Sequence, residues 1–266
     1  MNTRTIVKFA VAVAALAALA VGGYAVVTTR AGGSGASQPT ATPSLASASP
    51  TIVSTPTQPP PPERWMVAKV LRPLDVYGRP ATTAPVKTHL ERLNANRYPN
   101  VMLVKNTRES DGVIWYHVYV AMRPNGSTGW VPEGDVALYP TTAKIVIDLS
   151  QRTLTVTRRG QQMGTFPVAI GTADLPTPTG FFFVNQKLKP PTSNTAFGVL
   201  AIGISAFQMK LPASAWAQGG PVAIHGTNDP SCIGKAVSHG CVRMYNADVL
   251  KVSDWVPTGS PVIIQK

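Results

Sequence analysis

Hydrophobic and polar residues alternate with a period of two through much of the chain after residue 62. In the run from Trp115 to Val120, for example, one set of alternate positions holds Trp115, His117 and Tyr119, and the other holds Tyr116, Val118 and Val120. This alternation is typical of β-strands, because successive side chains point to opposite faces of a sheet. Similar short runs predict further strands at residues 129–131, 144–148, 153–156, 165–170, 181–184 and 261–264. The pattern therefore predicts a mainly β protein.

Turn-forming residues separate these runs, and one helix is predicted near the end of the chain. Pro124-Asn125-Gly126 and Arg158-Arg159-Gly160-Gln161 indicate tight turns. Asn246 is a favourable N-cap for a short helix. That helix would carry its apolar residues on one side, namely Val249, Leu250 and Val252.

A different hydrophobic pattern occupies the first 30 residues. The segment 9–27 contains nineteen residues without a charge, preceded by Arg4 and Lys8 and followed by Arg30. About 20 apolar residues cross a bilayer as a helix, whereas the apolar part of a signal peptide has about 7–15. Residues 1–30 are therefore predicted to be a cytoplasmic stub and a transmembrane anchor, with the rest of the chain outside the membrane. The alternative is cleavage, and hence secretion, at the Ala-x-Ala pattern that ends at Ala20.

Residues 31–62 have the composition of a tether. They contain no charged residue, eleven Ser or Thr and eight Pro, and they end in four consecutive prolines. Such a segment cannot bury enough apolar surface to offset its ordering entropy, so we predict a disordered linker. A change in the pattern then divides the rest of the chain into two compact β regions, 63–142 and 143–266.

The charge of the chain narrows the choice of partner. The 266 residues include 24 Lys or Arg and 12 Asp or Glu, a formal net charge of +12, and this balance favours anionic partners. Residues 1–62 and 63–142 contribute +3 each and residues 143–266 contribute +6. Because no basic stripe with interleaved aromatic residues occurs, we expect no nucleic-acid partner.

Reactive residue types gather between His225 and Arg243. His225 ends an apolar run, and Cys241 follows sixteen residues later in the segment Ser238-His239-Gly240-Cys241. The thiolate is the nucleophilic form of cysteine, and a thiol with a pKa of about 8.5 needs a neighbouring imidazole or other cation to reach it. A glycine directly before the cysteine allows a substrate to approach and frees N–H groups for an oxyanion.

The alternative interpretation of this segment is structural. Two cysteines in an exported protein usually form a disulfide, here between Cys232 and Cys241, and such a bond would disable the chemistry. Adventitious zinc bound by His225, Cys232, His239 and Cys241 is less favoured, because their spacing is not that of a zinc site.

At these positions the sequence resembles the L,D-transpeptidases with a YkuD-type catalytic domain. The resemblance rests on residues 225–228 and on the string Ser238-His239-Gly240-Cys241-Val242-Arg243, and it extends over about residues 143–266. Residues 177–181 resemble the family's Thr-Pro-x-Gly-x-Phe element, and residues 203–207 fit as well. The family implies a β-rich catalytic domain with a short helix after the cysteine.

Upstream, the pair Trp115-Tyr116 and the string Gly129-Trp130-Val131-Pro132 resemble the end of bacterial SH3-like domains. This resemblance implies a small SH3-like β-barrel over residues 63–142. A wall-binding role for it and a role as a mere spacer are both open.

The resemblance to L,D-transpeptidases implies a two-step acyl transfer between peptidoglycan stem peptides, without a metal or organic cofactor. Cys241 would form a thioester with a donor tetrapeptide, and an amine of a neighbouring stem would take the acyl group to form a 3→3 cross-link. His225 would be the general base and acid. Ser238 would hold the loop or His225 by a hydrogen bond, and His239 would orient the loop and the substrate. The backbone N–H groups around Gly240 and Cys241 would bind the oxyanion. The implied substrate contacts are Arg243, Thr227, Asn228, Thr179 and Phe207.

Two other functions stay open at this point. If water replaces the amine, the same residues make an L,D-carboxypeptidase or endopeptidase. A non-enzymatic wall-binding protein, in which the SH3-like region is the active part, is the other alternative. The oligomeric state is not predicted.

Overall fold

The computed structural model describes residues 63–214 and 220–266, which are mainly β and contain one α-helix. They belong to a single compact unit. The predicted anchor and linker, residues 1–62, lie outside the described residues. Within the described ranges, no helix is both long enough and apolar enough to cross a bilayer.

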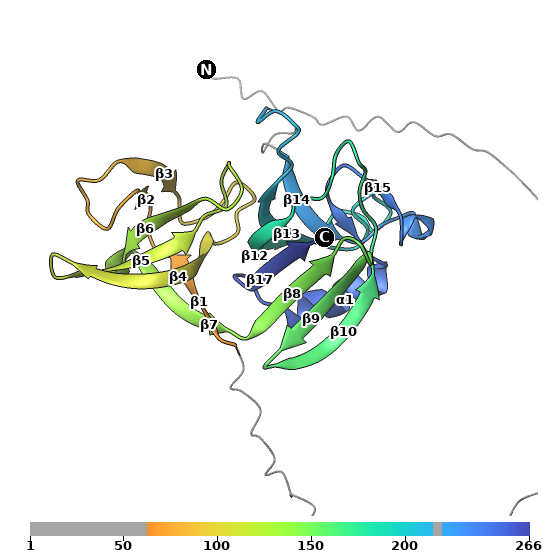
Figure 1. Ribbon diagram of the computed structural model, residues 1–266, viewed down its shortest axis with the longest axis horizontal. Helices are drawn as coiled ribbons and strands as arrows, with labels where there is room; N and C mark the ends of the chain where they lie inside the picture. Colours follow the sequence, from red (N-terminus) through yellow and green to blue (C-terminus); the bar gives the residue numbers. More distant parts are fainter. Residues whose placement is uncertain (1–62, 215–219) are drawn as a thin grey trace, which may run out of the picture. The chain divides into compact units, whose positions relative to one another are not determined.

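The first sheet contains seven strands in the order β3-β2-β6-β5-β4-β1-β7, drawn in orange to yellow-green in Figure 1. All its pairings are antiparallel. The short 3-10 helix η1 (Glu133–Asp135) precedes its last strand. The strands are β1 (Trp65–Val70), β2 (Leu74–Tyr77), β3 (Val86–Leu90), β4 (Val101–Ser110), β5 (Val113–Tyr119), β6 (Thr128–Pro132) and β7 (Val136–Thr141).

The sequence predictions for this region concern β5, β6 and the turn between them. The alternating run at Trp115 is β5, residues 129–131 lie in β6, and the two strands pair with Trp115 opposite Pro132. Residues 124–126 form the predicted turn. The assignment of this region as SH3-like stays a prediction.

The second sheet contains eight strands in the order β10-β9-β8-β17-β12-β13-β14-β16. Two of its pairings, β8 with β17 and β14 with β16, are parallel. A separate parallel pair is formed by β11 and β15, and η2 (Pro230–Cys232) is a 3-10 turn. The strands are β8 (Ala143–Asp148), β9 (Thr153–Arg158), β10 (Gln161–Pro167), β11 (Ile170–Gly171), β12 (Gly180–Leu188), β13 (Ala201–Phe207), β14 (Pro221–His225), β15 (Ala236–Ser238), β16 (Val242–Arg243) and β17 (Pro261–Gln265).

Four strands predicted in this region are confirmed as β8, β9, β12 and β17, and the hairpin turn between β9 and β10 is confirmed too. In that turn Arg159 and Gly160 both have positive φ, 53° and 78°. The strand predicted at 165–170 is wrong in its second half, because β10 ends at Pro167. Ala169 leaves the hairpin and instead exchanges two backbone hydrogen bonds with Arg243, each 2.9 Å.

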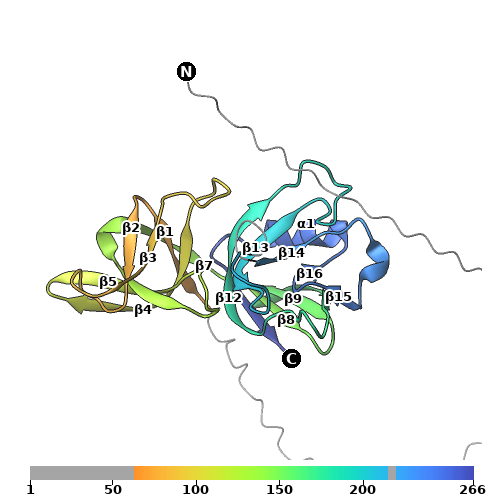
Figure 2. The same ribbon diagram turned by 90° about the horizontal axis from the view of Figure 1, so that it is seen from above.

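The predicted helix is α1 (Asn246–Trp255), which packs against the second sheet (Figure 2). Val249 and Val252 are buried, but Leu250 is 45% exposed, which corrects the prediction that the three share one side. Residues three apart share one face of a helix, whereas a residue one position further along is turned away by about 100°. Asn246 is not the N-cap either, since that position belongs to Tyr245, and no side chain caps this helix end.

A buried cluster joins the two regions. It contains Val67, Val101 and Leu103 of the first region and Phe183 of β12, and all four are at most 7% exposed. Beside it, Thr141 Oγ1 lies 3.0 Å from Ser260 Oγ, and the Tyr139 hydroxyl donates to the Thr258 carbonyl over 3.1 Å. Gly259 packs so closely here that a Cβ would lie 2.3 Å from a Val67 methyl group. The two regions therefore share a packed interface.

Candidate active site

Two neighbouring strands bring His225 and Cys241 together. β14 and β16 pair in parallel, with Ile224 opposite Val242 and His225 opposite Arg243. Val222 and Ile224 are buried and fix the inward face of β14. Because Cys241 directly precedes β16, this register places it beside Ala223. Residues that are sixteen positions apart in sequence thus lie at one end of the sheet.

A cavity of about 650 Å³ opens at this place. Five of the predicted site residues line it, namely His225, Ser238, His239, Cys241 and Arg243. The walls come from β12, β13, β14 and the segment around Phe197. Thr227 and Asn228 line a neighbouring cavity of about 440 Å³ together with Asn246. Thr179 is exposed, and neither it nor Phe207 lines either cavity.

His225 is buried and held in one tautomer. Its Nδ1 lies 2.6 Å from the Gly226 carbonyl oxygen, which can only accept, so Nδ1 carries the proton and Nε2 keeps its lone pair. The Phe197 ring covers the imidazole at a centroid distance of 4.9 Å. Burial lowers the pKa of His225 to about 4, the hydrogen bond to Gly226 opposes this and the Arg243 charge adds to it. The imidazole is therefore neutral near pH 7 and able to accept a proton.

The Cys241 thiol is also kept neutral by its surroundings. Burial raises its pKa, while a backbone hydrogen bond from Ala223 and the positive charge of Arg243 act in the opposite direction. From the sequence, a neighbouring imidazole or other cation was expected to help form the thiolate, with His225 as the base. The structure favours a neutral thiol and a neutral imidazole that line one cavity, so the proton would leave sulfur as the nucleophile attacks.

Ser238 holds the loop that carries Cys241. Its hydroxyl donates to the Cys241 carbonyl over 2.6 Å and accepts from the Gly240 N–H over 3.1 Å. The Gly240 N–H is thus already engaged within the loop. Among the described residues, the Cys241 amide has no acceptor and remains the available donor for an oxyanion. Gly240 has a φ of 116°, a backbone conformation that favours glycine.

His239 and Arg243 face the cavity in different ways. His239 is exposed, so its ring is accessible to a bound molecule. The backbone of Arg243 is fixed by its two hydrogen bonds to Ala169. Its Nε is buried and lacks a hydrogen-bond acceptor among the described residues. A buried guanidinium donor without a partner favours binding of an anionic group such as a carboxylate.

Asn246 is a site residue that the sequence argument did not find. Its Oδ1 accepts from the N–H groups of Thr227 and Val199 at 3.0 and 3.3 Å, and its Nδ2 donates to the Thr227 carbonyl at 3.0 Å. Gly226 leaves room for this amide, because a Cβ there would lie 2.1 Å from Asn246 Oδ1. Asn246 therefore fixes the turn that follows His225. The sequence signal at this position was an asparagine before a helix, which indicated only a cap.

The two cysteines do not form a disulfide. Both are free, so the alternative of a Cys232–Cys241 bond is wrong. Cys232 is 4% exposed, and its sulfur lies 4.0 Å from Thr227 Oγ1. Within residues 63–214 and 220–266, no group of three or more His, Cys, Asp or Glu side chains is placed to hold a metal ion.

Comparison with known proteins identifies the family. Residues 142–264 match the family model of the L,D-transpeptidase catalytic domain, YkuD. YkuD of Bacillus subtilis strain 168 is 34% identical over 128 residues, which are 48% of this chain and 69% of that protein. YkuD of Bacillus licheniformis is 38% identical over 122 residues, 46% of this chain and 64% of that protein. The chain belongs to the YkuD family of L,D-transpeptidase catalytic domains.

Solved structures are also similar, at TM-scores below 0.5. The Bdellovibrio bacteriovorus protein Bd1075 has a TM-score of 0.39 and 25% identity over 47% of this chain and 48% of that one. The faropenem-derived adduct of L,D-transpeptidase 3 from Mycobacterium tuberculosis has a TM-score of 0.39 and 17% identity, and the match covers 61% of this chain and 98% of that one. The family assignment rests on the sequence matches alone.

Proposed function

We propose that this protein is a peptidoglycan L,D-transpeptidase that forms 3→3 cross-links between stem peptides through a thioester on Cys241. The observation that supports this most directly is the shared cavity of Cys241, the buried neutral His225 and the unpartnered Nε of Arg243. It provides a nucleophile, a base and an anion-binding donor in one place. Membership of the YkuD family supports the substrate class.

In the first step, Cys241 Sγ attacks the carbonyl carbon of the third residue of a donor tetrapeptide. His225 Nε2 takes the thiol proton, and the Cys241 amide stabilises the oxyanion. The C–N bond to the terminal D-Ala then breaks. The imidazolium of His225 returns its proton to the leaving amine, and the acyl group remains on sulfur as a thioester.

In the second step, the side-chain amine of a neighbouring stem attacks the thioester carbonyl. His225 takes a proton from this amine and passes it to the departing sulfur, so both side chains return to their resting neutral state. General acid–base catalysis of this kind contributes about 10²- to 10⁴-fold to the rate. Neither step requires a metal ion or an organic cofactor.

The remaining predicted residues take supporting roles. Arg243 would bind a carboxylate of the stem with its guanidinium, and the exposed His239, which lines the same cavity, would contact the substrate. Thr227 and Asn228 would contact a substrate only if it extends into the neighbouring cavity that they line. Contacts from Thr179 and Phe207 stay predictions without a cavity that supports them.

The N-terminal segments would place this domain at its substrate. From their sequence, we infer that residues 1–30 anchor the chain in the cell membrane and that residues 31–62 tether an extracytoplasmic enzyme within reach of the wall. Fractionation tests this inference. The full chain should sediment with membranes, and a chain that begins at residue 31 should not. Release of the full chain in a shortened form would instead indicate cleavage and secretion.

A mass-resolved assay tests the proposed activity. The full chain in detergent is incubated with a disaccharide-tetrapeptide, and the products are separated by mass. We expect a cross-linked dimer and released D-Ala, and we expect Cys241→Ala to form neither. Cys232→Ala is the matched control, because it removes the other thiol of the same domain and should retain the activity.

Three outcomes would decide against the proposal. Trimmed tripeptide without any dimer would indicate an L,D-carboxypeptidase, in which water replaces the amine. Full activity of Cys241→Ala would refute the cysteine mechanism. A wild-type chain that forms no product and carries no adduct on Cys241 after treatment with an acylating carbapenem would favour a non-enzymatic wall-binding protein.

A further inference from the structure

A turn of the first region contacts the chain that leads away from β13. Asn125, in the turn between β5 and β6, donates from Nδ2 to the Phe207 carbonyl over 2.9 Å and accepts the Phe207 N–H on Oδ1 over 2.8 Å. One side-chain amide thus pairs with both backbone groups of the last residue of β13, as a neighbouring strand would.

Arg123 makes a second contact from the same turn. Its Nη2 donates to the carbonyl oxygens of Gln208 and Leu211 at 2.6 and 2.8 Å. One donor nitrogen that binds two carbonyl oxygens holds them close to each other. The restraint is firm because hydrogen bonds from an ionised group are stronger than those between neutral groups. Residues 207–211 are therefore held from the first region at three backbone positions.

Gln208 connects this held segment to the loop of Cys241. The side chain is 3% exposed, and its Nε2 donates to the carbonyl oxygens of Pro176 and His239 at 2.9 and 3.3 Å. Its Oε1 accepts the Lys210 N–H at 3.1 Å. The amide also lies against Gly240, where a Cβ would come within 2.6 Å of Gln208 Nε2. Gln208 thus contacts both residues that directly precede Cys241.

From these contacts we propose that Gln208, Arg123 and Asn125 are positioning residues for Cys241. The first region, through its 121–127 turn, holds residues 207–211, and Gln208 holds the backbone of His239 and Gly240 in the conformation that presents the thiol. None of the three lines the cavity that contains Cys241 and His225. The catalytic consequence rests on the proposed function, whereas the effect on the thiol does not.

The same interface contains a contact suited to serve as a control. The Tyr139 hydroxyl donates to Thr258, so Tyr139→Phe weakens the association of the two regions at a segment that does not contact the Cys241 loop. If the first region only stabilised the second, Tyr139→Phe and Asn125→Ala would have the same effect on Cys241. If it positions the loop, only Asn125→Ala changes the properties of the thiol.

Two measurements on the full chain test the proposal. The first is the pH dependence of Cys241 alkylation by iodoacetamide, read from the mass of the peptide that contains it. The buried thiol of Cys232, alkylated in the same sample, reports any general opening of the domain. The second is kcat and KM for the disaccharide-tetrapeptide. The variants are Gln208→Met, which keeps the side-chain length without its N–H donors, Asn125→Ala, Arg123→Ala, Tyr139→Phe and the exposed, charge-matched Arg79→Ala.

We expect Gln208→Met to lower kcat about 10- to 100-fold with little change in KM, because a displacement of about 1 Å at a reacting atom has an effect of this size. Loosening the loop admits water, so the pH midpoint of Cys241 alkylation should fall towards that of an ordinary thiol. Asn125→Ala and Arg123→Ala should act in the same direction, and Asn125→Asp, which keeps the acceptor for Phe207 N–H, should be milder. Tyr139→Phe and Arg79→Ala should match the wild type.

Three results would overturn the proposal. The first is that Gln208→Met and Asn125→Ala leave the alkylation midpoint of Cys241 and kcat unchanged. The second is that Tyr139→Phe changes them as much as Asn125→Ala does. The third is that the alkylation of Cys232 rises together with that of Cys241 in every affected variant. Failure of the proposed function would look different. In that case the wild-type chain would be alkylated at Cys241 yet release no product from the tetrapeptide, and the pH midpoints would still test the positioning.

Discussion

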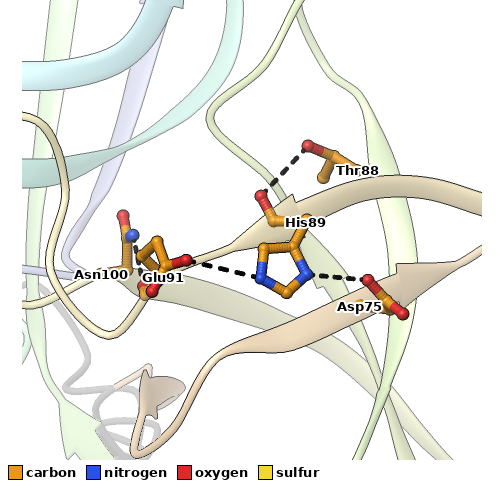
Figure 3. A network of polar contacts seen from close by, with 5 residues as sticks. All are labelled: Asp75, Thr88, His89, Glu91 and Asn100. Carbon is orange, nitrogen blue, oxygen red and sulfur yellow. Dashed lines mark hydrogen bonds and ion pairs between the residues drawn. The ribbon is translucent and has the colours of Figure 1, made fainter.

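Two histidines, one in each region, show how the surroundings set the chemistry of the same side chain. His225 is buried, and burial lowers its pKa to about 4. His89 is an exposed residue of β3, opposite Asp75 of β2 (Figure 3). Its Nδ1 lies 2.9 Å from Asp75 Oδ1 and its Nε2 lies 3.6 Å from Glu91 Oε1. The hydrogen bond to Asp75 is the largest cause that raises the pKa of His89. Desolvation opposes it, and the charges of Asp75 and Glu91 raise the pKa further.

The comparison teaches that the direction of the pKa shift follows from solvation and neighbouring charge. A histidine between two carboxylates is stabilised as a cation and forms an ion pair with them. A histidine in an apolar pocket next to an arginine stays neutral and keeps a lone pair for proton transfer. An unprotonated imidazole is the form that a general base needs, and burial provides this form near pH 7.

The largest expected effect separates the two histidines by their role in catalysis. His225→Gln should lower kcat of the cross-linking assay about 10²- to 10⁴-fold, because the thiol loses its proton acceptor. His89→Gln should leave kcat and KM at the wild-type values. Rates from the mass-resolved assay measure both. Equal rates for the two variants would remove the functional side of the comparison.

The second effect concerns stability in acid. An unfolded histidine with a pKa near 6.5 binds a proton more readily than buried His225, so His225 supports the fold above about pH 6.5. This support is lost as the pH falls through about 4, on the order of 3 kcal/mol in the free energy of unfolding. Urea unfolding of wild type and His225→Gln near pH 7 and pH 4 measures the effect. The wild type should lose more stability between the two conditions, and equal losses would contradict the buried neutral histidine.

The third effect tests how much Asn246 stabilises the turn that follows His225. Asn246→Ala leaves the N–H groups of Thr227 and Val199 without their acceptor, so the free energy of unfolding should fall by about 1–3 kcal/mol. Asn246→Asp retains the acceptor oxygen and loses only the donor to the Thr227 carbonyl, so it should fall by less. Urea unfolding near pH 7 ranks the three chains. If the aspartate variant were no more stable than the alanine variant, the acceptor role would be wrong.

The smallest effect belongs to His89. Its raised pKa means that the folded chain binds the proton more tightly, so the contribution to stability is full below about pH 6.5 and disappears as the pH rises through the raised value. Because the side chain is exposed, salt screens the pair and the contribution is small. NMR titration of wild type, Asp75→Asn and Arg79→Ala measures the pKa of His89 directly. The pKa should fall in Asp75→Asn and stay unchanged in Arg79→Ala.

The elements that the sequence predicted well are those with a local cause. The alternation around Trp115 identified β5, and the Arg158–Gln161 turn was identified by Gly160, which accepts positive φ. The apolar residues of α1 were only partly assigned, because Leu250 belongs to the apolar class and still faces solvent. The end of the strand β10 at Pro167 was missed, because Ala169 is hydrogen-bonded to Arg243, which lies 74 positions away in the chain.

The candidate site divides in the same way. The reactive types and the string from Ser238 to Arg243 are properties of the sequence. They sufficed to identify the YkuD family and to propose Cys241 and His225 as site residues. The roles of Ser238, Gln208 and Asn246 depend on which carbonyl or N–H group each side chain meets. Those partners come from distant segments, so no local pattern contains them.

Composition, period and motif are local properties, so the sequence alone was enough to indicate the family and the mainly β character of the chain and to propose Cys241 and His225 as the residues for acyl transfer. Only the tertiary structure decided that His225 rests neutral, that the Gly240 N–H is engaged by Ser238, and that a turn of the first region contacts the segment next to Cys241. Burial and hydrogen-bond partners control these features, and both arise when strands far apart in sequence pack together.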